Sequence, residues 1–195
     1  RTLDPGTMGG DEGWGFRITM LLVTIGGIFI VSSLIGVITS GLEAQLEHLR
    51  KGRSLVLESG HTVILGWSPQ IFTVISELVV SNENRKKGAV VAILANQDKV
   101  EMEDAIRERI PDTKNTKVIC RSGSPIDLND LEIVSPHLAR SIIVLPPDDN
   151  DPDSHVVKTV LAITNNPNRR KEPYHIVTQI QEQTTLDVLK MVGQE

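Results

Sequence analysis

Hydrophobic residues are distributed along the chain in two different ways. Residues 18–42 contain no Asp, Glu, Lys or Arg, whereas the chain after residue 60 alternates short apolar runs with helical patterns. The uncharged segment has 25 residues. A helix of that length spans ~37 Å, enough to cross a hydrocarbon core of ~30 Å. A buried helix of a soluble protein and a secretory signal are the alternatives, but no A-x-A-like cleavage site follows. We therefore predict a transmembrane helix over residues 18–42.

The remaining pattern predicts a linker over residues 43–60 and a domain over 61–195. The linker begins as an amphipathic continuation of the helix and is expected to leave the helical conformation near Gly52. Strands are predicted at Thr62–Gly66, Ala89–Ala95, Lys117–Cys120, Ser141–Leu145 and His175–Ile180. Helices are predicted at Pro69–Ser81, Lys99–Ile110, Asp127–Val134, Ser154–Asn165 and Thr185–Met191. Val- and Ile-rich strands alternating with helices predict an α/β fold with a doubly wound parallel sheet. The alternation stops after the fifth helix, so we expect a sixth strand beyond Glu195.

Charge and composition exclude several functions. The 195 residues carry 20 basic and 25 acidic side chains, a net charge of −5, which argues against nucleic-acid binding. The single cysteine, Cys120, excludes a disulfide framework and a Cys-rich zinc site. The five histidines are scattered without a catalytic motif, so no enzyme active site is predicted. Arg50, Lys51 and Arg53 follow the apolar segment and favour a cytoplasmic location for the C-terminal domain.

Small residues mark one face of the apolar segment. Ser32, Gly36 and Ser40 recur every four residues, a stripe that lets membrane helices approach closely. Gly26 and Gly27 are candidates for a hinge, with helix packing as the alternative.

The first strand-to-helix turn is the place where a doubly wound sheet binds nucleotides. It reads Gly66-Trp67-Ser68-Pro69-Gln70-Ile71, and only the first glycine of the G-x-G-x-x-G fingerprint is kept. Ser68 permits a fairly close backbone approach and can cap the helix, whereas Ile71 should separate helix from strand. Asn96 replaces the acidic residue expected after the second strand, and Asp98 follows it. These departures disfavour standard NAD binding and leave a degenerate nucleotide site or a structural turn.

A run of carboxylates follows the fourth predicted strand. Asp149, Asp151 and Asp153, with Asp148 before them, resemble the start of an EF-hand loop. Its sixth position is occupied by serine and its twelfth by valine, which excludes an EF-hand. Either Asp153 caps the next helix in a solvated loop, or the oxygens bind a divalent cation.

Four longer motifs make the sequence similar to the CASTOR/POLLUX family of ion channels. They are Leu49-Arg50-Lys51-Gly52-Arg53-Ser54, Ile64-Leu65-Gly66-Trp67-Ser68, Val118-Ile119-Cys120-Arg121-Ser122-Gly123-Ser124-Pro125 and Ala139-Arg140-Ser141-Ile142-Ile143-Val144-Leu145. The resemblance extends over essentially the whole chain. It implies a pore followed by a Rossmann domain of the RCK, or TrkA-N-like, type that regulates conductance.

The resemblance also gives a role to the N-terminal residues. Leu3-Asp4-Pro5-Gly6 stands where plant members carry Ala-Asp-Ala-Gly in the pore loop. Residues 1–17 would then end the pore loop, Asp4 and Gly6 would line the selectivity filter, and residues 18–42 would line the pore. The resemblance suggests Ca²⁺ as a regulatory ligand, with a nucleotide as the alternative. We expect a membrane protein that assembles as a homotetramer around one pore, through which cations pass.

These observations lead to the hypothesis of a ligand-gated cation channel, in which the ligand acts on the pore through residues 41–54. A non-conducting nucleotide-binding regulatory subunit of a cation transporter is one alternative, against which the pore loop argues. A membrane-anchored NAD-dependent oxidoreductase is another, against which the two missing glycines argue.

Overall fold

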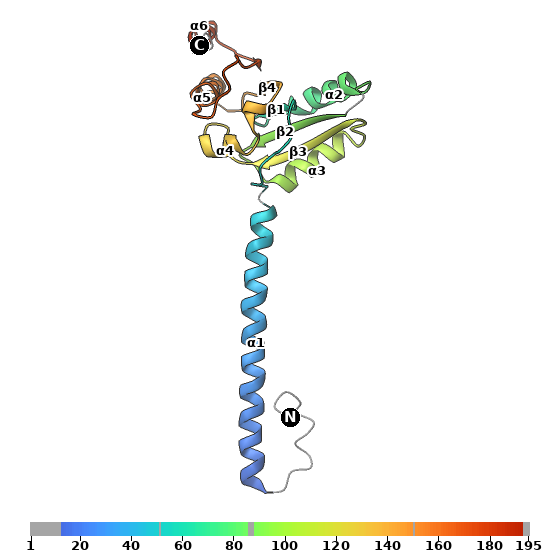
Figure 1. Cartoon of the computed structure of the whole chain (residues 1–195), viewed down its shortest axis with the longest axis vertical. Helices are drawn as coiled ribbons and strands as arrows, with labels where there is room; N and C mark the ends of the chain where they lie inside the picture. Colours follow the sequence, from blue (N-terminus) through green and yellow to red (C-terminus); the bar gives the residue numbers. More distant parts are fainter. Residues whose placement is uncertain (1–12, 51, 86–87, 150, 193–195) are drawn as a thin grey trace. The chain divides into compact units, whose positions relative to one another are not determined.

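The chain divides into two compact units. The computed structural model describes residues 13–50, 52–85, 88–149 and 151–192 (Figure 1). The units are Arg1–His48 and Leu49–Glu195, so the division falls within the predicted linker. In order, the elements are α1 (Trp14–Arg50), β1 (Thr62–Leu65), α2 (Ile71–Asn82), β2 (Ala89–Ala95), α3 (Lys99–Arg109), β3 (Thr116–Ser122), α4 (Leu128–Glu132), a 3₁₀ turn (Pro136–Leu138), β4 (Ser141–Val144), α5 (Pro152–Thr164), β5 (Ile176–Thr178) and α6 (Gln183–Val192).

Helix α1 is continuous over 37 residues, and Gly26 and Gly27 do not interrupt it. Its Trp14–Gly41 part is, among the described residues, the one helix long and apolar enough to cross a membrane. The large side chains of this part are exposed, with Phe29 and Val37 each 72% accessible. A water-facing apolar surface of this extent is unfavourable, so lipid or other helices must cover it.

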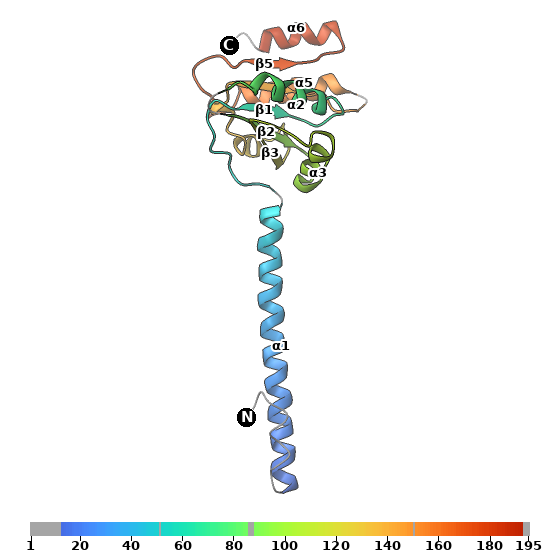
Figure 2. The same ribbon diagram turned by 90° about the vertical axis from the view of Figure 1, so that its right-hand side faces the viewer.

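The second unit contains a five-stranded parallel sheet in the order β3-β2-β1-β4-β5 (Figure 2). In register, Thr62 of β1 lies beside Val91 of β2 and Ser141 of β4. The chain therefore winds outward in one direction from β1 to β3 and then returns to add β4 and β5 on the other side. This confirms the predicted doubly wound sheet.

Helices cover both faces of this sheet because both faces of its central strands are apolar. Ile64 and Ile93 point to one face and pack with Ile71 and Ile75 of α2 and Met102 of α3. On the other face, the core side chains come from β1, β4, α4 and α5, and include Val63, Leu65, Leu131, Val144, Val156 and Val160. Burial of both faces accounts for strands that lack polar alternation.

The strands and helices predicted within residues 61–195 all form, with shifted ends. β3 is longer than predicted and β5 shorter. α4 ends at Glu132, before the predicted end, and Ser135, with a left-handed φ of 46°, separates it from the 3₁₀ turn. α1 ends at Arg50, and Gly52 follows with φ of 61°, a glycine conformation typical of helix ends. Residues 52–61 are irregular, so the linker predicted over 43–60 is helical in its first part and irregular in its second. We call residues 52–61 the connector.

Candidate functional site

The turn after β1 is shaped by backbone packing at the centre of the sheet. Gly66 has φ of 99°, and its N–H donates to the carbonyl of Leu94 at 2.9 Å. A Cβ on Gly66 would lie 2.5 Å from the carbonyl oxygen of Leu145, which follows β4. Glycine is therefore required here by both the dihedral angle and the space. This glycine of the fingerprint is needed by the fold itself, with or without a ligand.

Ser68 does not take its predicted role as the cap of α2. The N-cap of α2 is Gln70 rather than Ser68, and Ser68 contributes its carbonyl, which accepts from the N–H of Ile71 at 3.0 Å. The hydroxyl of Ser68 is buried without a hydrogen-bond partner in the part of the chain that is described. Ile71 is fully buried in the core beside β1 and β2. The helix is thus anchored to the sheet by a side chain where the fingerprint has a glycine.

A cavity of about 260 Å³ lies at the carboxyl ends of β1, β2 and β4. This is the place where the strand order reverses and where doubly wound sheets bind ligands. The structure brings together here the predicted Gly66, Trp67 and Asn96. The wall is completed by Leu65, Gln97, Ser124, Pro125, Ile126, Leu145, Pro147, His155 and Thr159. Its lining is a mixture of amides, hydroxyls and apolar surface.

A second cavity of about 410 Å³ shares Asn96, Gln97 and Ser124 with the first. Asp98 lines it, and its Oδ1 caps α3 by accepting from the N–H of Val100 at 2.7 Å. The connector supplies one wall through Arg53. The guanidinium of Arg53 lies 3.9 Å from the carboxylate of Asp130 on α4. A ligand in this space would therefore touch the segment that follows α1.

A third cavity of about 480 Å³ lies beside the turn, lined by Trp67, Ser68, Gln97, Arg109 and Asp148 among others. Trp67 meets Phe72 edge to face, with 5.7 Å between the ring centroids. The guanidinium of Arg109 lies 4.1 Å from the centre of the Phe72 ring. Gln97 lines all three cavities. We call the three together the strand-end cleft.

The acidic run serves local structure. Asp151, and not Asp153, is the N-cap of α5, accepting from the N–H of Ser154 at 3.2 Å. Asp153 is 6% exposed and its carboxylate accepts from the N–H groups of Gln181 and Glu182 at 3.0 and 2.9 Å. Asp149 lies 3.9 Å from His155. Within the described residues, no group of three or more His, Cys, Asp or Glu could hold a metal ion.

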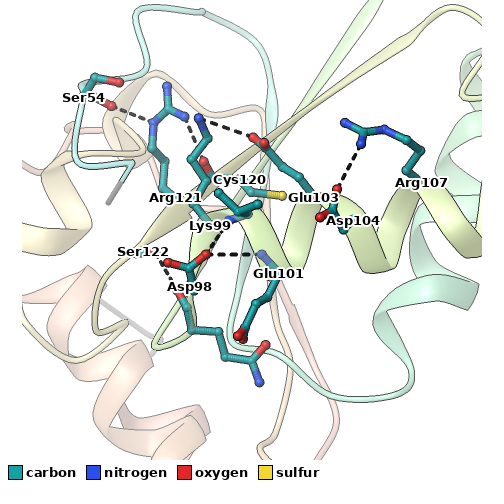
Figure 3. A network of polar contacts seen from close by, with 12 residues as sticks. Ser54, Asp98, Lys99, Glu101, Glu103, Asp104, Arg107, Cys120, Arg121 and Ser122 are labelled. Atoms are coloured by element: carbon teal, nitrogen blue, oxygen red, sulfur yellow. Dashed lines mark hydrogen bonds and ion pairs between the residues drawn. The ribbon is translucent and has the colours of Figure 1, made fainter. Parts of the chain in front are cut away.

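A network of polar contacts surrounds the carboxyl end of β3, near Cys120 and Arg121 (Figure 3). Arg121 donates from Nε to the carbonyl of Ser54 in the connector at 2.7 Å and from Nη1 to the carbonyl of Cys120 at 2.8 Å. Burial raises the pKa of the Cys120 thiol to about 12, with the carboxylate of Glu103 adding to the effect. Burial also lowers the pKa of Arg121. Cys120 is thus a buried core residue whose thiol stays neutral at physiological pH.

Comparison with curated proteins shows similarity over nearly the whole chain. The chain is 35% identical over 192 residues to a probable ion channel CASTOR of Oryza sativa subsp. japonica and 36% identical to the ion channel CASTOR of Lotus japonicus. It is 38% identical over 196 residues to a probable ion channel POLLUX of Arabidopsis thaliana. These alignments cover 97–98% of the chain and 21–23% of the relatives.

The chain is homologous to a segment of the CASTOR/POLLUX ion channels. This confirms the resemblance drawn from the sequence motifs. The chain spans about a fifth of the length of these relatives. The relatives are named as ion channels and not as enzymes, which agrees with the absence of a predicted catalytic site. No protein-family model matches the chain.

Solved structures give the fold of the second unit. The RCK domain of GsuK matches 73% of the chain with a TM-score of 0.52 and 21% identity. This match covers 26% of the GsuK chain. The GsuK channel bound to NAD matches 98% of the chain with a TM-score of 0.52 and 20% identity, and 32% of that chain is covered. At this identity the likeness shows the fold alone. The CASTOR/POLLUX-like chain therefore contains an RCK-type Rossmann sheet and a candidate membrane helix.

Some of the predicted site residues are described by the structure and others are not. Asp4 and Gly6, the predicted filter residues, lie outside the described residues. Ser32, Gly36 and Ser40 lie in α1 and are exposed. Sequence reasoning missed Arg53, Phe72, Gln97, Arg109, Ser124, Asp130 and His155. Arg53 and Ser124 stand in motifs shared with the CASTOR/POLLUX family, but the other side chains meet only through the tertiary fold.

Proposed function

We propose that the chain is the part of a cation channel that joins the pore to its ligand-sensing domain. In this proposal, residues 1–17 end the pore loop with Asp4 and Gly6 in the filter, and α1 lines the pore. The second unit lies in the cytoplasm and belongs to a ring formed by four subunits. The observation that carries the proposal is the similarity to CASTOR/POLLUX channels over both units, with a connector that forms a wall of the strand-end cleft.

An adenine nucleotide is the ligand class that the cleft favours. Trp67, Ile126 and Pro147 offer apolar surface for a base, and Asn96 and Gln97 offer amides to pair with it. Arg53 and Arg109 line cavities that share Gln97 with the central one, and they supply positive charge for phosphates. Solved GsuK structures of the same fold are described as bound to NAD and to ADP.

Ca²⁺ is the second ligand class, supported by the family resemblance and by the acidic residues around α5. Asp151 is exposed and lines a cavity beside α5. A regulatory cation would need further oxygen ligands, such as water or groups from another subunit.

The mechanism is thermodynamic linkage. A ligand that binds one arrangement of the second unit more tightly shifts the pore equilibrium by its difference in affinity between the two arrangements. Arg53 gives the ligand a direct contact with the connector.

The ion pathway is tested by single-channel recording of the full-length protein in planar bilayers. Asp4→Asn should change the selectivity among cations, because a ring of carboxylates in the filter sets the field felt by the ion. Asp11→Asn removes the same charge from a position outside the proposed filter and should leave selectivity unchanged. Equal selectivity in the wild type and Asp4→Asn would remove Asp4 from the filter.

A further inference from the structure

The connector is fastened to the segment that follows α4. The N–H of Val56 donates to the carbonyl of Ile133 at 2.7 Å, and the N–H of Gly60 donates to that of Leu138 at 2.8 Å. Val56 is 2% exposed and belongs to the same core cluster as Leu131 of α4 and Val134. The connector is therefore part of the folded domain and not a free tether.

Two side chains reinforce this attachment. The hydroxyl of Ser135 donates to the carbonyl of Val56 at 2.8 Å, in a fully buried position. The Nε2 of His61 lies 2.8 Å from the carbonyl of Val134, which can only accept, so Nε2 carries the proton. The Nε of Arg121 on β3 also donates to the carbonyl of Ser54 in the connector.

Ser135 holds this position in an uncommon backbone conformation. Its φ of 46° and ψ of 60° lie in the left-handed region, which residues other than glycine and asparagine rarely adopt. Such conformations persist where the surrounding contacts determine them, and they cluster at functional and switching segments. At Ser135 the determining contact is the hydrogen bond from its hydroxyl to the carbonyl of Val56 in the connector.

The other end of α4 reaches the strand-end cleft. Asp130, in the first turn of α4, accepts from the N–H of Ser124 at 2.8 Å and lines the cavity that contains Arg53. The carbonyl of Asp130 accepts from the N–H of Ile133 at 3.1 Å. The short helix α4 thus joins a cleft residue to the turn that holds Val56.

We propose that Ser135 is a conformational clip, through which movements at the strand-end cleft reach the connector and thereby the pore helix. This inference rests on the proposed channel function and assigns its transmission to named bonds. When a ligand displaces Ser124 and Asp130, α4 carries the displacement to Ser135, which pulls on the carbonyl of Val56. Ser135 and Arg121 are positioning residues, because neither is required to touch the ligand.

The test compares full-length wild type with Ser135→Ala and Ser135→Asn in lipid nanodiscs. Hydrogen exchange of connector peptides is measured first. Loss of one buried hydrogen bond should accelerate exchange over residues 52–61 by about three- to tenfold in Ser135→Ala. Asparagine tolerates the left-handed conformation and its amide can donate to Val56, so Ser135→Asn should restore protection. Ser141→Ala removes a hydroxyl that lies 3.3 Å from His175 and is the matched control.

Single-channel recording gives a second measurement, the open probability, which should not change if Ser135 only stabilises the fold. Ser135→Ala should change the open probability without ligand and weaken its response to ligand, while ADP affinity of the purified protein stays within about twofold. Ser135→Gly, which accepts the left-handed backbone but lacks the hydroxyl, is the second variant should Ser135→Ala fail to fold. Unchanged connector exchange in both variants would overturn the clip, and so would faster exchange with wild-type gating. If the wild type carries no current, the proposed channel function is refuted. The hydrogen-exchange rates of the connector peptides then test the clip by themselves.

Discussion

The space that a side chain on Gly66 would occupy is taken by the carbonyl oxygen of Leu145. The two backbones meet where β1 and β4 end, at the reversal point of the strand order, and a Cβ on Gly66 would come within 2.5 Å of that oxygen. The contact fixes how closely the turn after β1 approaches β4. It also sets the floor of the strand-end cleft, because both residues line it.

Gly66→Ala should therefore destabilise the second unit by about 2–4 kcal/mol, through a strained dihedral angle and a backbone clash. Gly60 provides the matched control, since its φ is 68° but nothing lies within 4 Å of the position that a Cβ would take there. Gly60→Ala should cost about 1 kcal/mol from the dihedral angle alone. Urea unfolding followed by circular dichroism measures both. Equal losses in the two variants would show that the Leu145 contact contributes nothing.

Ser68→Ala should have opposite effects on stability and on ligand affinity. The hydroxyl is buried without a partner among the described residues, so its removal should leave the thermal midpoint unchanged or raise it. A nucleotide that pairs with this hydroxyl should then bind about three- to tenfold more weakly. Calorimetric titration of the full-length protein with ADP measures the affinity. A lowered midpoint, or an unchanged affinity, would contradict the role given to Ser68.

Asp153→Asn should loosen α6 from α5. Its carboxylate accepts from two successive N–H groups before α6, and a side-chain amide offers a single carbonyl for them. We expect a loss of about 1–3 kcal/mol and earlier proteolytic cleavage within residues 179–192. Asp151→Asn is the control, because asparagine caps helices as well as aspartate does. Identical cleavage of the two variants would refute the anchoring role. Loss of a Ca²⁺ response in Asp151→Asn alone would instead support the cation site.

Cys120 should make stability fall at alkaline pH. The pKa of its thiol rises from 9.0 to about 12 on burial. Above pH 9 the unfolded chain loses this proton while the folded chain keeps it, so unfolding is favoured as pH rises. At about pH 10 the wild type should lose about 1 kcal/mol relative to Cys120→Ala, compared with the difference at neutral pH. A pH-independent difference between the two proteins would contradict the burial of a neutral thiol.

The sequence predicted the fold well because the fold depends on local patterns. The uncharged residues 18–42 and the Val- and Ile-rich runs are visible without any tertiary information. The ends of elements were predicted less well, because a residue such as Ser135 can adopt a left-handed conformation between α4 and the 3₁₀ turn that its residue type does not predict. The cap of α5 was assigned to Asp153 instead of Asp151, because both carboxylates stand at the start of the helix.

Only some residues of the strand-end cleft could be predicted, because local patterns place only those that directly follow strands. Gly66, Trp67 and Asn96 follow strands, so their meeting at the carboxyl edge is a consequence of parallel strands. Arg53 and Asp130 approach each other only because the connector folds back onto α4. The spacing of residues along the sequence does not predict the contact between Arg53 and Asp130.

The most direct test of the central claim is the open probability of the full-length protein in planar bilayers, recorded while ADP, NAD or Ca²⁺ is added on the side of the C-terminal unit. The proposal predicts cation currents whose open probability changes with at least one of these ligands, and a nucleotide response that is weakened in Ser68→Ala. Currents that ignore all three ligands, or a protein that carries no current, would contradict it.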